Sequence, residues 1–234
     1  MARLTSPRPS AALQALLLAV SLSAGPAHAA TAQPAGEVLK LAPPQLNGPM
    51  SVEQALQQRR SQREFAALPL RLDDVSQLLW AAQGVTHGPG YRTAPSAGAL
   101  APLEVYLVAA RVTGLASGVY RYQPPTHALL AVRAGDRRAQ IAAAAHGQPA
   151  LRDAPALLVI AAVYPRTVAR YGSRGERYVH MEAGHAAQNV YLQCTARGLA
   201  TVLVGAFDDA ALREALGLPA DHVPLALMPV GHPR

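Results

Sequence analysis

Three arginines and a serine lie close together in the segment QRRSQREF, which spans Gln58 to Phe65. Arg59 and Arg63 are four residues apart, so a helix would place both on the same face, with Ser61 between them in the sequence. A guanidinium group binds a phosphate through two parallel hydrogen bonds, and a serine hydroxyl adds a short donor. The segment indicates either a phosphate cradle or a solvent-exposed basic face, and these residues alone leave both interpretations open.

Several common catalytic chemistries lack their motifs here. The sequence has no G-x-S-x-G, no H-E-x-x-H, no P-loop and no G-x-G-x-x-G. His180 and His185 are five residues apart and would lie on different helical faces, so we expect no metal site. Glu182 and His185 are one helical turn apart, which favours a structural hydrogen-bonded pair. Cys194 has apolar neighbours, which favours a place in the core rather than a nucleophilic role.

The composition indicates one globular domain with a basic surface. The chain has 234 residues, half of them hydrophobic, which is enough for one sizeable core. The net charge is +7, and Lys40 is the only lysine among the basic residues. The arginines are spread along the chain with few aromatic residues among them, so we expect no nucleic-acid partner. A single cysteine excludes an internal disulfide and a cysteine-rich metal site.

The N-terminal segment has the pattern of a secretory signal peptide. Arg3 and Arg8 precede the apolar run AALQALLLAVSLSA, and Ala27-His28-Ala29 supplies the small residues of a cleavage site. We expect cleavage of residues 1–29 near Ala29 and an exported protein, periplasmic or secreted. The alternative is an uncleaved anchor, but the apolar run is short for a bilayer, so we expect no stable membrane span. Residues 30–50, rich in Pro, Gly and Ala, indicate a linker or a wrapping arm.

Helical and strand patterns from residue 51 onward predict one α+β domain over 51–234. We expect helices that begin at the capping box SVEQ and that span 72–83, 176–197 and 208–216. We expect strands at 103–110, 119–122, 128–132, 156–163, 201–204 and in the segment VPLALMPVG. The middle of the long helix, AGHAAQN, has small side chains, which predicts close packing against another helix of this chain or of a second subunit.

The order of seven segments resembles that of the nitroreductase-like flavoproteins, and within them the SagB-type dehydrogenases. The segments are RRSQREF, LLWAAQG, YRTAPSAGALAPLEVYLV, GVYRY, EAGHAAQNVYL, GLATVLVGAFD and PLALMPVGHP. Together they extend over most of 51–233. The resemblance implies a central, mainly antiparallel sheet flanked by helices, and a homodimer that binds FMN non-covalently at the subunit interface.

The resemblance also implies roles for individual residues. Arg59, Arg60 and Ser61 would bind the phosphate and ribityl end of FMN. Arg63 would lie near N1 and O2 of the ring, where a fixed cation stabilises the charge of reduced flavin. Two further segments would contact the cofactor, the first from the partner subunit: Pro95, Ser96, Ala97 and Gly98; and Leu203, Val204, Gly205 and Ala206. The N–H group of Gly205 or Ala206 would donate to N5 of the flavin.

The sequence departs from the family at its acid–base residues. Members that oxidise azolines use a lysine–tyrosine pair, whereas this chain offers Arg170-Tyr171 and Arg177-Tyr178 ahead of the long helix. Tyr171 and Tyr178 are therefore the catalytic candidates. Because arginine stays protonated and is a poor general base, azole formation is not expected.

The resemblance and the export signal together suggest a function. We expect an exported FMN-dependent oxidoreductase that transfers hydride between a small organic substrate and flavin N5 by a ping-pong cycle. Little NAD(P)H is present outside the cytoplasm, which favours substrate oxidation with oxygen or a quinone as acceptor. The alternatives are reduction of nitro or quinone compounds, and a flavin-binding protein without turnover.

Overall fold

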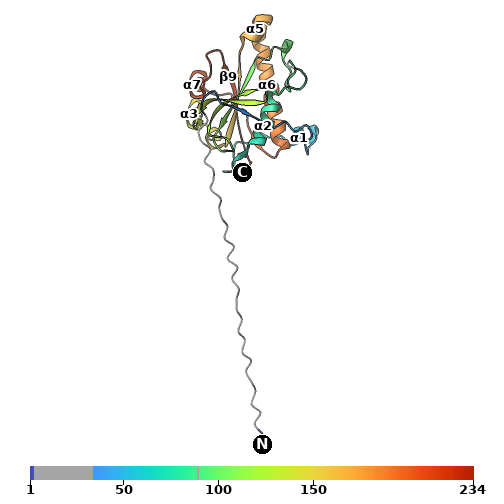
Figure 1. Ribbon diagram of the computed structural model, residues 1–234, viewed down its shortest axis with the longest axis vertical. Helices are drawn as coiled ribbons and strands as arrows, with labels where there is room; N and C mark the ends of the chain where they lie inside the picture. Colours follow the sequence, from blue (N-terminus) through green and yellow to red (C-terminus); the bar gives the residue numbers. More distant parts are fainter. Residues whose placement is uncertain (3–33, 89) are drawn as a thin grey trace.

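A seven-stranded sheet forms the centre of the protein (Figure 1). The computed structural model describes residues 1–2, 34–88 and 90–234. The strand order is β1-β6-β5-β3-β7-β9-β8, and every neighbouring pair is antiparallel. The strands are β1 (Val38–Lys40), β3 (Leu103–Ala109), β5 (Gly118–Gln123), β6 (Ala128–Ala134), β7 (Ala156–Ala162), β8 (Ala200–Thr201) and β9 (Val223–Gly231). The expected mainly antiparallel sheet is confirmed.

Helices cover both faces of this sheet. Figure 1 shows α2 and α6 on one side of the strands and α3 and α7 on the other. The helices are α1 (Val52–Gln58), α2 (Leu72–Gln83), α3 (Arg138–Ala144), α4 (Pro149–Asp153), α5 (Pro165–Tyr171), α6 (Arg174–Ala196) and α7 (Asp209–Leu216). A short parallel pair, β2 (Leu70–Arg71) with β4 (Val112–Thr113), and a 3-10 turn at Ala97–Ala99 complete the elements.

The two central strands are buried on both faces. β3 and β7 pair from Leu103 with Ala162 to Ala109 with Ala156, and every residue of both strands is buried. Because helices lie above and below them, both strands are almost continuously apolar rather than alternating. The exception is Glu104, whose carboxylate is bound by two arginines.

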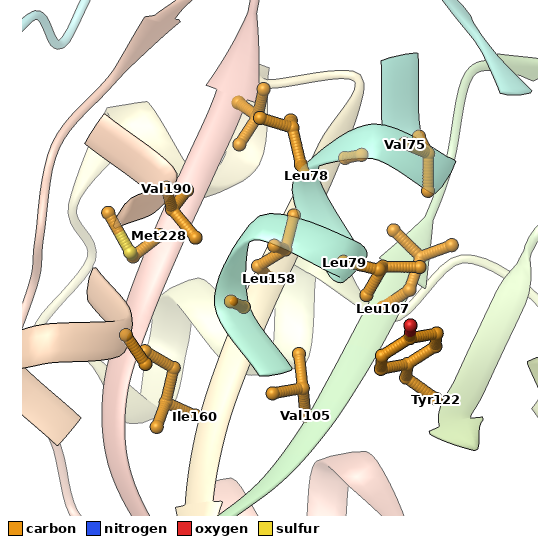
Figure 2. Close-up of a cluster of buried hydrophobic side chains, with 14 of the residues drawn as sticks. Val75, Leu78, Leu79, Val105, Leu107, Tyr122, Leu158, Ile160, Val190 and Met228 are labelled. Atoms are coloured by element: carbon orange, nitrogen blue, oxygen red, sulfur yellow. The ribbon is translucent and has the colours of Figure 1, made fainter. Parts of the chain in front are cut away.

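One hydrophobic core lies between the sheet and the α2–α6 layer. Figure 2 shows Val75, Leu78 and Leu79 of α2 above side chains of the strands. The strand residues labelled there are Val105, Leu107, Tyr122, Leu158, Ile160 and Met228, and Val190 comes from α6. A second core packs α3, α4 and α7 against the opposite face. The first core fixes α6 relative to the strands, since the buried apolar residues of this helix belong to it.

Local signals set the helix ends. Ser51 forms the expected capping box, in which the Gln54 N–H donates to Ser51 Oγ (3.2 Å) and the Ser51 N–H donates to Gln54 Oε1 (3.0 Å). The Asp208 side chain caps α7 as expected. Gly84 ends α2, but at φ −61° it is not left-handed. Glycine is needed there because an added Cβ would lie 2.1 Å from Trp80 Cδ1.

The structure differs from the expectations in three places. Residues 38–40 of the expected linker form β1, which pairs with β6 of the same chain. The strand expected at 201–204 is only two residues long, and Val204 instead makes an isolated bridge to Leu227. Helices α3, α4 and α5 were not expected, because their short alanine- and arginine-rich sequences carry little hydrophobic periodicity.

The expected signal peptide, apart from its first two residues, lies outside the described part of the chain. Among the described residues, no helix has the length and apolar character needed to cross a bilayer.

The small residues in the middle of α6 lie in two different environments, one buried and one exposed. Ala183, Ala186 and Ala187 are buried within the chain and belong to the core shared with α2 and the sheet. Gly184 is exposed, and an added Cβ would meet no atom within 4 Å. Close packing is therefore internal at Ala187, whereas the face that carries Gly184 is open in the single chain.

Substitution at these two neighbouring positions should have opposite effects. Ala187→Leu adds bulk to a filled core and should destabilise the fold by about 1–3 kcal/mol. Gly184→Ala, the matched control, adds a methyl group in open space and should stabilise the helix by roughly 0.5–1 kcal/mol. Urea unfolding of both variants measures the difference. An Ala187→Leu protein as stable as the parent would contradict the internal packing.

Candidate functional site

Tyr191 of α6 joins two of the segments singled out in the sequence. Its hydroxyl accepts a hydrogen bond from the Leu203 N–H (2.7 Å) and lies 3.0 Å from Ser61 Oγ. Because the hydroxyl already accepts from Leu203, its own hydrogen is free to be donated to Ser61. The Arg59 guanidinium lies over the Tyr191 ring, 5.1 Å from the centroid, at a distance typical of a cation–π contact.

Backbone contacts hold the arginine-rich segment in place. Helix α1 ends at Gln58, Arg59 caps its end with φ −53° and ψ 127°, and the chain then runs toward β8. The Gln62 N–H donates to the Thr201 carbonyl (2.9 Å), which fixes the segment beside the strand. Arg60 Nη1 donates to the carbonyls of Gln57 and Arg59, so this side chain caps the end of α1. The exposed Arg63 makes no hydrogen bond or ion pair with the described residues.

The loop after β8 presents backbone donors next to this segment. Val204 is buried and exchanges two backbone hydrogen bonds with Leu227, which anchors the loop to β9. Leu203, Gly205 and Ala206 are exposed. Within the described chain, the N–H groups of Gly205 and Ala206 donate to no acceptor. The loop therefore offers two open N–H groups on a rigidly held backbone.

The segment Pro95–Gly98 forms a strained turn elsewhere on the protein. Ser96 Oγ accepts from the Ala101 N–H (2.9 Å), which closes the turn. Gly98, Ala99 and Ala101 have φ values of 61°, 55° and 44°, in the left-handed region. Two alanines in this region store strain, which is common at functional sites and persists only where the surroundings hold the backbone.

The two catalytic candidates lie together against this turn. The rings of Tyr171 and Tyr178 meet edge to face with centroids 5.2 Å apart. A Cβ added to Gly98 would lie 2.8 Å from Tyr171 Oη and 3.0 Å from Arg170 Nη1, so a side chain there would push these two groups aside, and the left-handed φ of 61° also favours glycine. The structure thus groups Tyr171 and Tyr178 with the 95–98 segment.

Glu182 of α6 holds the backbone of this turn. This buried carboxylate accepts from the Ala97 N–H through Oε1 (2.9 Å), while its buried Oε2 has no hydrogen-bond partner in the described chain. Burial raises the pKa of Glu182, against the hydrogen bond from the Ala97 N–H and the influence of the nearby Ser96 and His185 side chains. The expected hydrogen bond between Glu182 and His185 is not formed, because the carboxylate faces the turn.

The remaining sequence candidates have structural roles. His180 is hydrogen-bonded to the Tyr164 hydroxyl (2.6 Å). Cys194 is buried in the core, as expected, and burial raises the pKa of its thiol. Among the described residues, no group of three His, Cys, Asp or Glu side chains is placed to bind a metal ion.

Two separate half-sites therefore lie along one helix. One half-site is the strained turn at 95–101, which Glu182 contacts. The other is the arginine-rich segment at 59–63 with the loop after β8, which Tyr191 contacts. At a rise of about 1.5 Å per residue, the nine intervening steps of α6 place these two anchor residues roughly 13 Å apart along the axis.

Comparison with known proteins shows the family of the chain. Residues 56–232 match the Nitroreductase family. The chain belongs to this family. A provisionally named nitroreductase of Methanocaldococcus jannaschii is 48% identical over 182 residues, which are 78% of this chain and 91% of that protein.

Solved nitroreductase structures have the same fold. A provisionally named nitroreductase of Ralstonia eutropha superposes with a TM-score of 0.74 at 33% identity, over 87% of this chain and 94% of that one. The NADPH:FMN oxidoreductase of Vibrio harveyi superposes with a TM-score of 0.57 at 21% identity, over 78% of this chain and 68% of that one. The protein is a flavin-dependent oxidoreductase of the nitroreductase family.

The residues present fit the flavin that this family generally uses. Arg59 and Arg63 supply positive charge, and Ser61 supplies a hydroxyl for a phosphate or ribityl group. The open N–H groups of Gly205 and Ala206 suit a ring nitrogen or carbonyl acceptor. Arg60 is turned toward α1, and its proposed contact with the phosphate stays a prediction.

Sequence reasoning missed Tyr191 and misassigned Glu182. Both lie in the segment EAGHAAQNVYL that carries the family resemblance, so the sequence indicated that this segment matters but not what these two side chains contact. Each acts through a contact with a distant segment: Tyr191 with Ser61 across 130 residues, and Glu182 with Ala97 across 85. No local pattern predicts such pairs.

Removing the Glu182 charge tests its place under the turn. A buried carboxyl with a raised pKa binds its proton more tightly in the folded protein than in the unfolded chain. As the pH rises above the ordinary pKa of 4.5, the unfolded chain loses this proton first, and the free energy of unfolding therefore falls. Glu182→Gln keeps the acceptor for Ala97 and removes this cost. We expect the variant to gain stability relative to the parent as the pH rises through that range, measured by urea unfolding from pH 4 to 7.

A stability difference independent of pH would contradict the raised pKa of Glu182. Glu182→Ala is the companion variant: it removes the acceptor as well as the charge and should loosen the turn, visible as faster amide exchange at residues 97–101.

Proposed function

We propose that the protein binds FMN non-covalently between two identical subunits and oxidises a small organic substrate. The observation that supports the proposal is the separation of the two half-sites along α6, each of which suits a different part of one cofactor. A two-fold symmetric dimer can place the arginine-rich segment of one subunit opposite the strained turn of the other. The exposed face around Gly184 lies on the same helix, between the two half-sites.

In this proposal, the arginine-rich segment binds the phosphate end of the cofactor. Arg59 and Ser61 are held by Tyr191, so their donors are oriented before binding and little conformational entropy is lost. Arg63, which makes no hydrogen bond or ion pair with the described residues, would place its guanidinium near N1 and O2. Leu203, Val204, Gly205 and Ala206 line one side, with an N–H group of Gly205 or Ala206 directed to N5.

The partner subunit's strained turn and its two tyrosines would complete the site. Bound FMN supplies a hydride acceptor at N5. Pro95, Ser96, Ala97 and Gly98 bring backbone close to the ring because their side chains are small. Tyr171, held against Gly98, is the candidate to hold or move a proton on the substrate, with Tyr178 packed on its ring to fix its orientation.

The direction of electron flow follows from the proposed export. If residues 1–29 are a cleaved signal peptide, the mature protein works where little NAD(P)H is present. Substrate oxidation followed by reoxidation with oxygen or a quinone, in a ping-pong cycle, then needs no nicotinamide. The order of sequence segments favours the SagB-type branch, and the absence of its lysine argues against azoline oxidation.

Reduction of nitro or quinone compounds is the second candidate. It is favoured by the Methanocaldococcus jannaschii relative, which is 48% identical and is named as a nitroreductase. The same site would serve both reactions, since only the electron donor and the acceptor differ. A flavin-binding protein without turnover would keep the cradle but show no reaction with any substrate.

FMN affinity should distinguish the two neighbouring arginines. Arg59→Ala removes a charged hydrogen bond and should weaken FMN binding by about 1.5–3 kcal/mol. Arg60→Ala is the matched control, because its guanidinium is already bound to helix carbonyls, and should weaken binding less. Fluorescence titration of FMN into the apoprotein measures both. A protein that binds no FMN, or equal losses in both variants, would contradict these assignments.

Reduction kinetics test the direction of catalysis. If no nicotinamide site is maintained, NADH should reduce the bound flavin slowly, whereas chemically reduced protein should reoxidise quickly with a quinone or oxygen. Anaerobic stopped-flow spectroscopy follows the flavin absorbance in both directions. Rapid and saturable reduction by NADH would favour the nitro- or quinone-reductase instead.

A further inference from the structure

A cavity lies at the end of the sheet where two strands separate. β3 and β5 pair from Ala109–Gly118 as far as Tyr106–Arg121, and beyond this point Leu103 to Val105 pair only with β7. A cavity of about 430 Å³ lies here, lined by residues of β3 and β5 together with Gln83, Arg92 and Arg166. Its size is in the range typical of small-molecule sites.

The lining carries more positive than negative charge. Arg121 Nε donates to Glu104 Oε2 (2.9 Å), and Arg166 Nη2 donates to Glu104 Oε1 (2.7 Å). Glu104 is the single carboxylate in the lining, and it faces three guanidinium groups. Asp221 also acts on Arg121, but it is exposed and lies outside the lining. Two positive charges therefore remain in excess.

Arg92 is the guanidinium that lacks a carboxylate. Its Nη1 is buried and has no hydrogen-bond partner in the described chain. Burial lowers its pKa, while the nearby charge of Glu104 opposes this. A buried, unsatisfied cationic donor is costly unless an anion or an acceptor completes it. Gln83 also lines the cavity, and its amide makes no hydrogen bond with the described residues.

We propose that this cavity binds a small organic anion. A carboxylate or phosphate group would face Arg92 and Arg121, whose Nη groups are not used by Glu104. Leu103, Pro124 and Pro125 provide an apolar wall for the remainder of the molecule. The cavity lies apart from the arginine-rich half-site, because none of the arginines in the 59–63 segment lines it, and it borders the strained turn at Ala101.

The cavity is connected to the strained turn through one side chain. Arg166 Nη1 donates to the Ala101 carbonyl (3.0 Å), and Ala101 is one of the residues with positive φ. Ala101 itself lines the cavity. Because Glu104 is bound by both Arg121 and Arg166, an anion at Arg121 would be linked to the 95–101 turn through Glu104 and Arg166. Anion binding here follows from the charges and contacts of this cavity alone and does not rest on the proposed flavin function.

Isothermal titration of the purified protein tests the site, with FMN present in excess so that the arginines at 59–63 are occupied. The probes are succinate and inorganic phosphate, with neutral succinamide as the control compound. We expect saturable binding of at least one anion and none of succinamide. Arg92→Gln should weaken that binding about tenfold or more, because it removes a charged donor without breaking the Glu104 pairs.

Arg152→Gln is the matched control variant, since Arg152 is an exposed arginine on α4 with a side chain that is 61% exposed. It should bind the anion as the parent does. Arg121→Gln is the second test variant, for use if Arg92→Gln does not fold. Binding of succinate alone would identify a carboxylate ligand, and binding of phosphate alone a phosphorylated one. No saturable anion binding, or binding unchanged in both test variants, would overturn the proposal.

Discussion

Helix α6 is the element on which the rest of the site depends. Its buried residues pack in the core against α2 and the sheet, so its axis cannot move without opening that core. Tyr191 holds the arginine-rich segment and the loop after β8, while Glu182 holds the strained turn. A straight helix keeps these two anchors at a fixed separation. In the proposed dimer, a cofactor that uses both half-sites would contact two chains.

The two half-sites differ in their physical character. The arginine-rich segment is cationic and presents side-chain donors, which suits a phosphate. The turn at 95–101 is small, backbone-rich and strained, and is held by a buried carboxylate with one unsatisfied oxygen. Strain of this kind persists only when neighbouring contacts maintain it, and Glu182 and Arg166 both provide such contacts. The strained backbone of the turn is thus held in place by the side chains of Glu182 and Arg166.

The sequence predicted the elements whose patterns are local. The capping box at Ser51, the amphipathic helix at 72–83 and the apolar strands β3 and β7 follow from periodicity and cap chemistry. β1 was not predicted, because it lies in a Pro- and Gly-rich stretch and its three residues form a strand only through pairing with β6. The roles of Tyr191 and Glu182 depend on distant partners, and the orientation of Arg60 depends on the end of α1, so none of these followed from spacing.

Complementation between subunits tests the central claim most directly. Arg59→Ala damages one half-site, and Gly98→Val damages the other by forcing a β-branched side chain into a left-handed position against Tyr171. Each variant alone should bind FMN weakly. When the two are mixed in equal amounts and exchange subunits, random pairing gives one intact site in every heterodimer, and FMN binding should recover to roughly a quarter of all sites. No recovery, in a sample whose heterodimers are verified by mass spectrometry, would show that each chain binds its cofactor alone and would contradict the account.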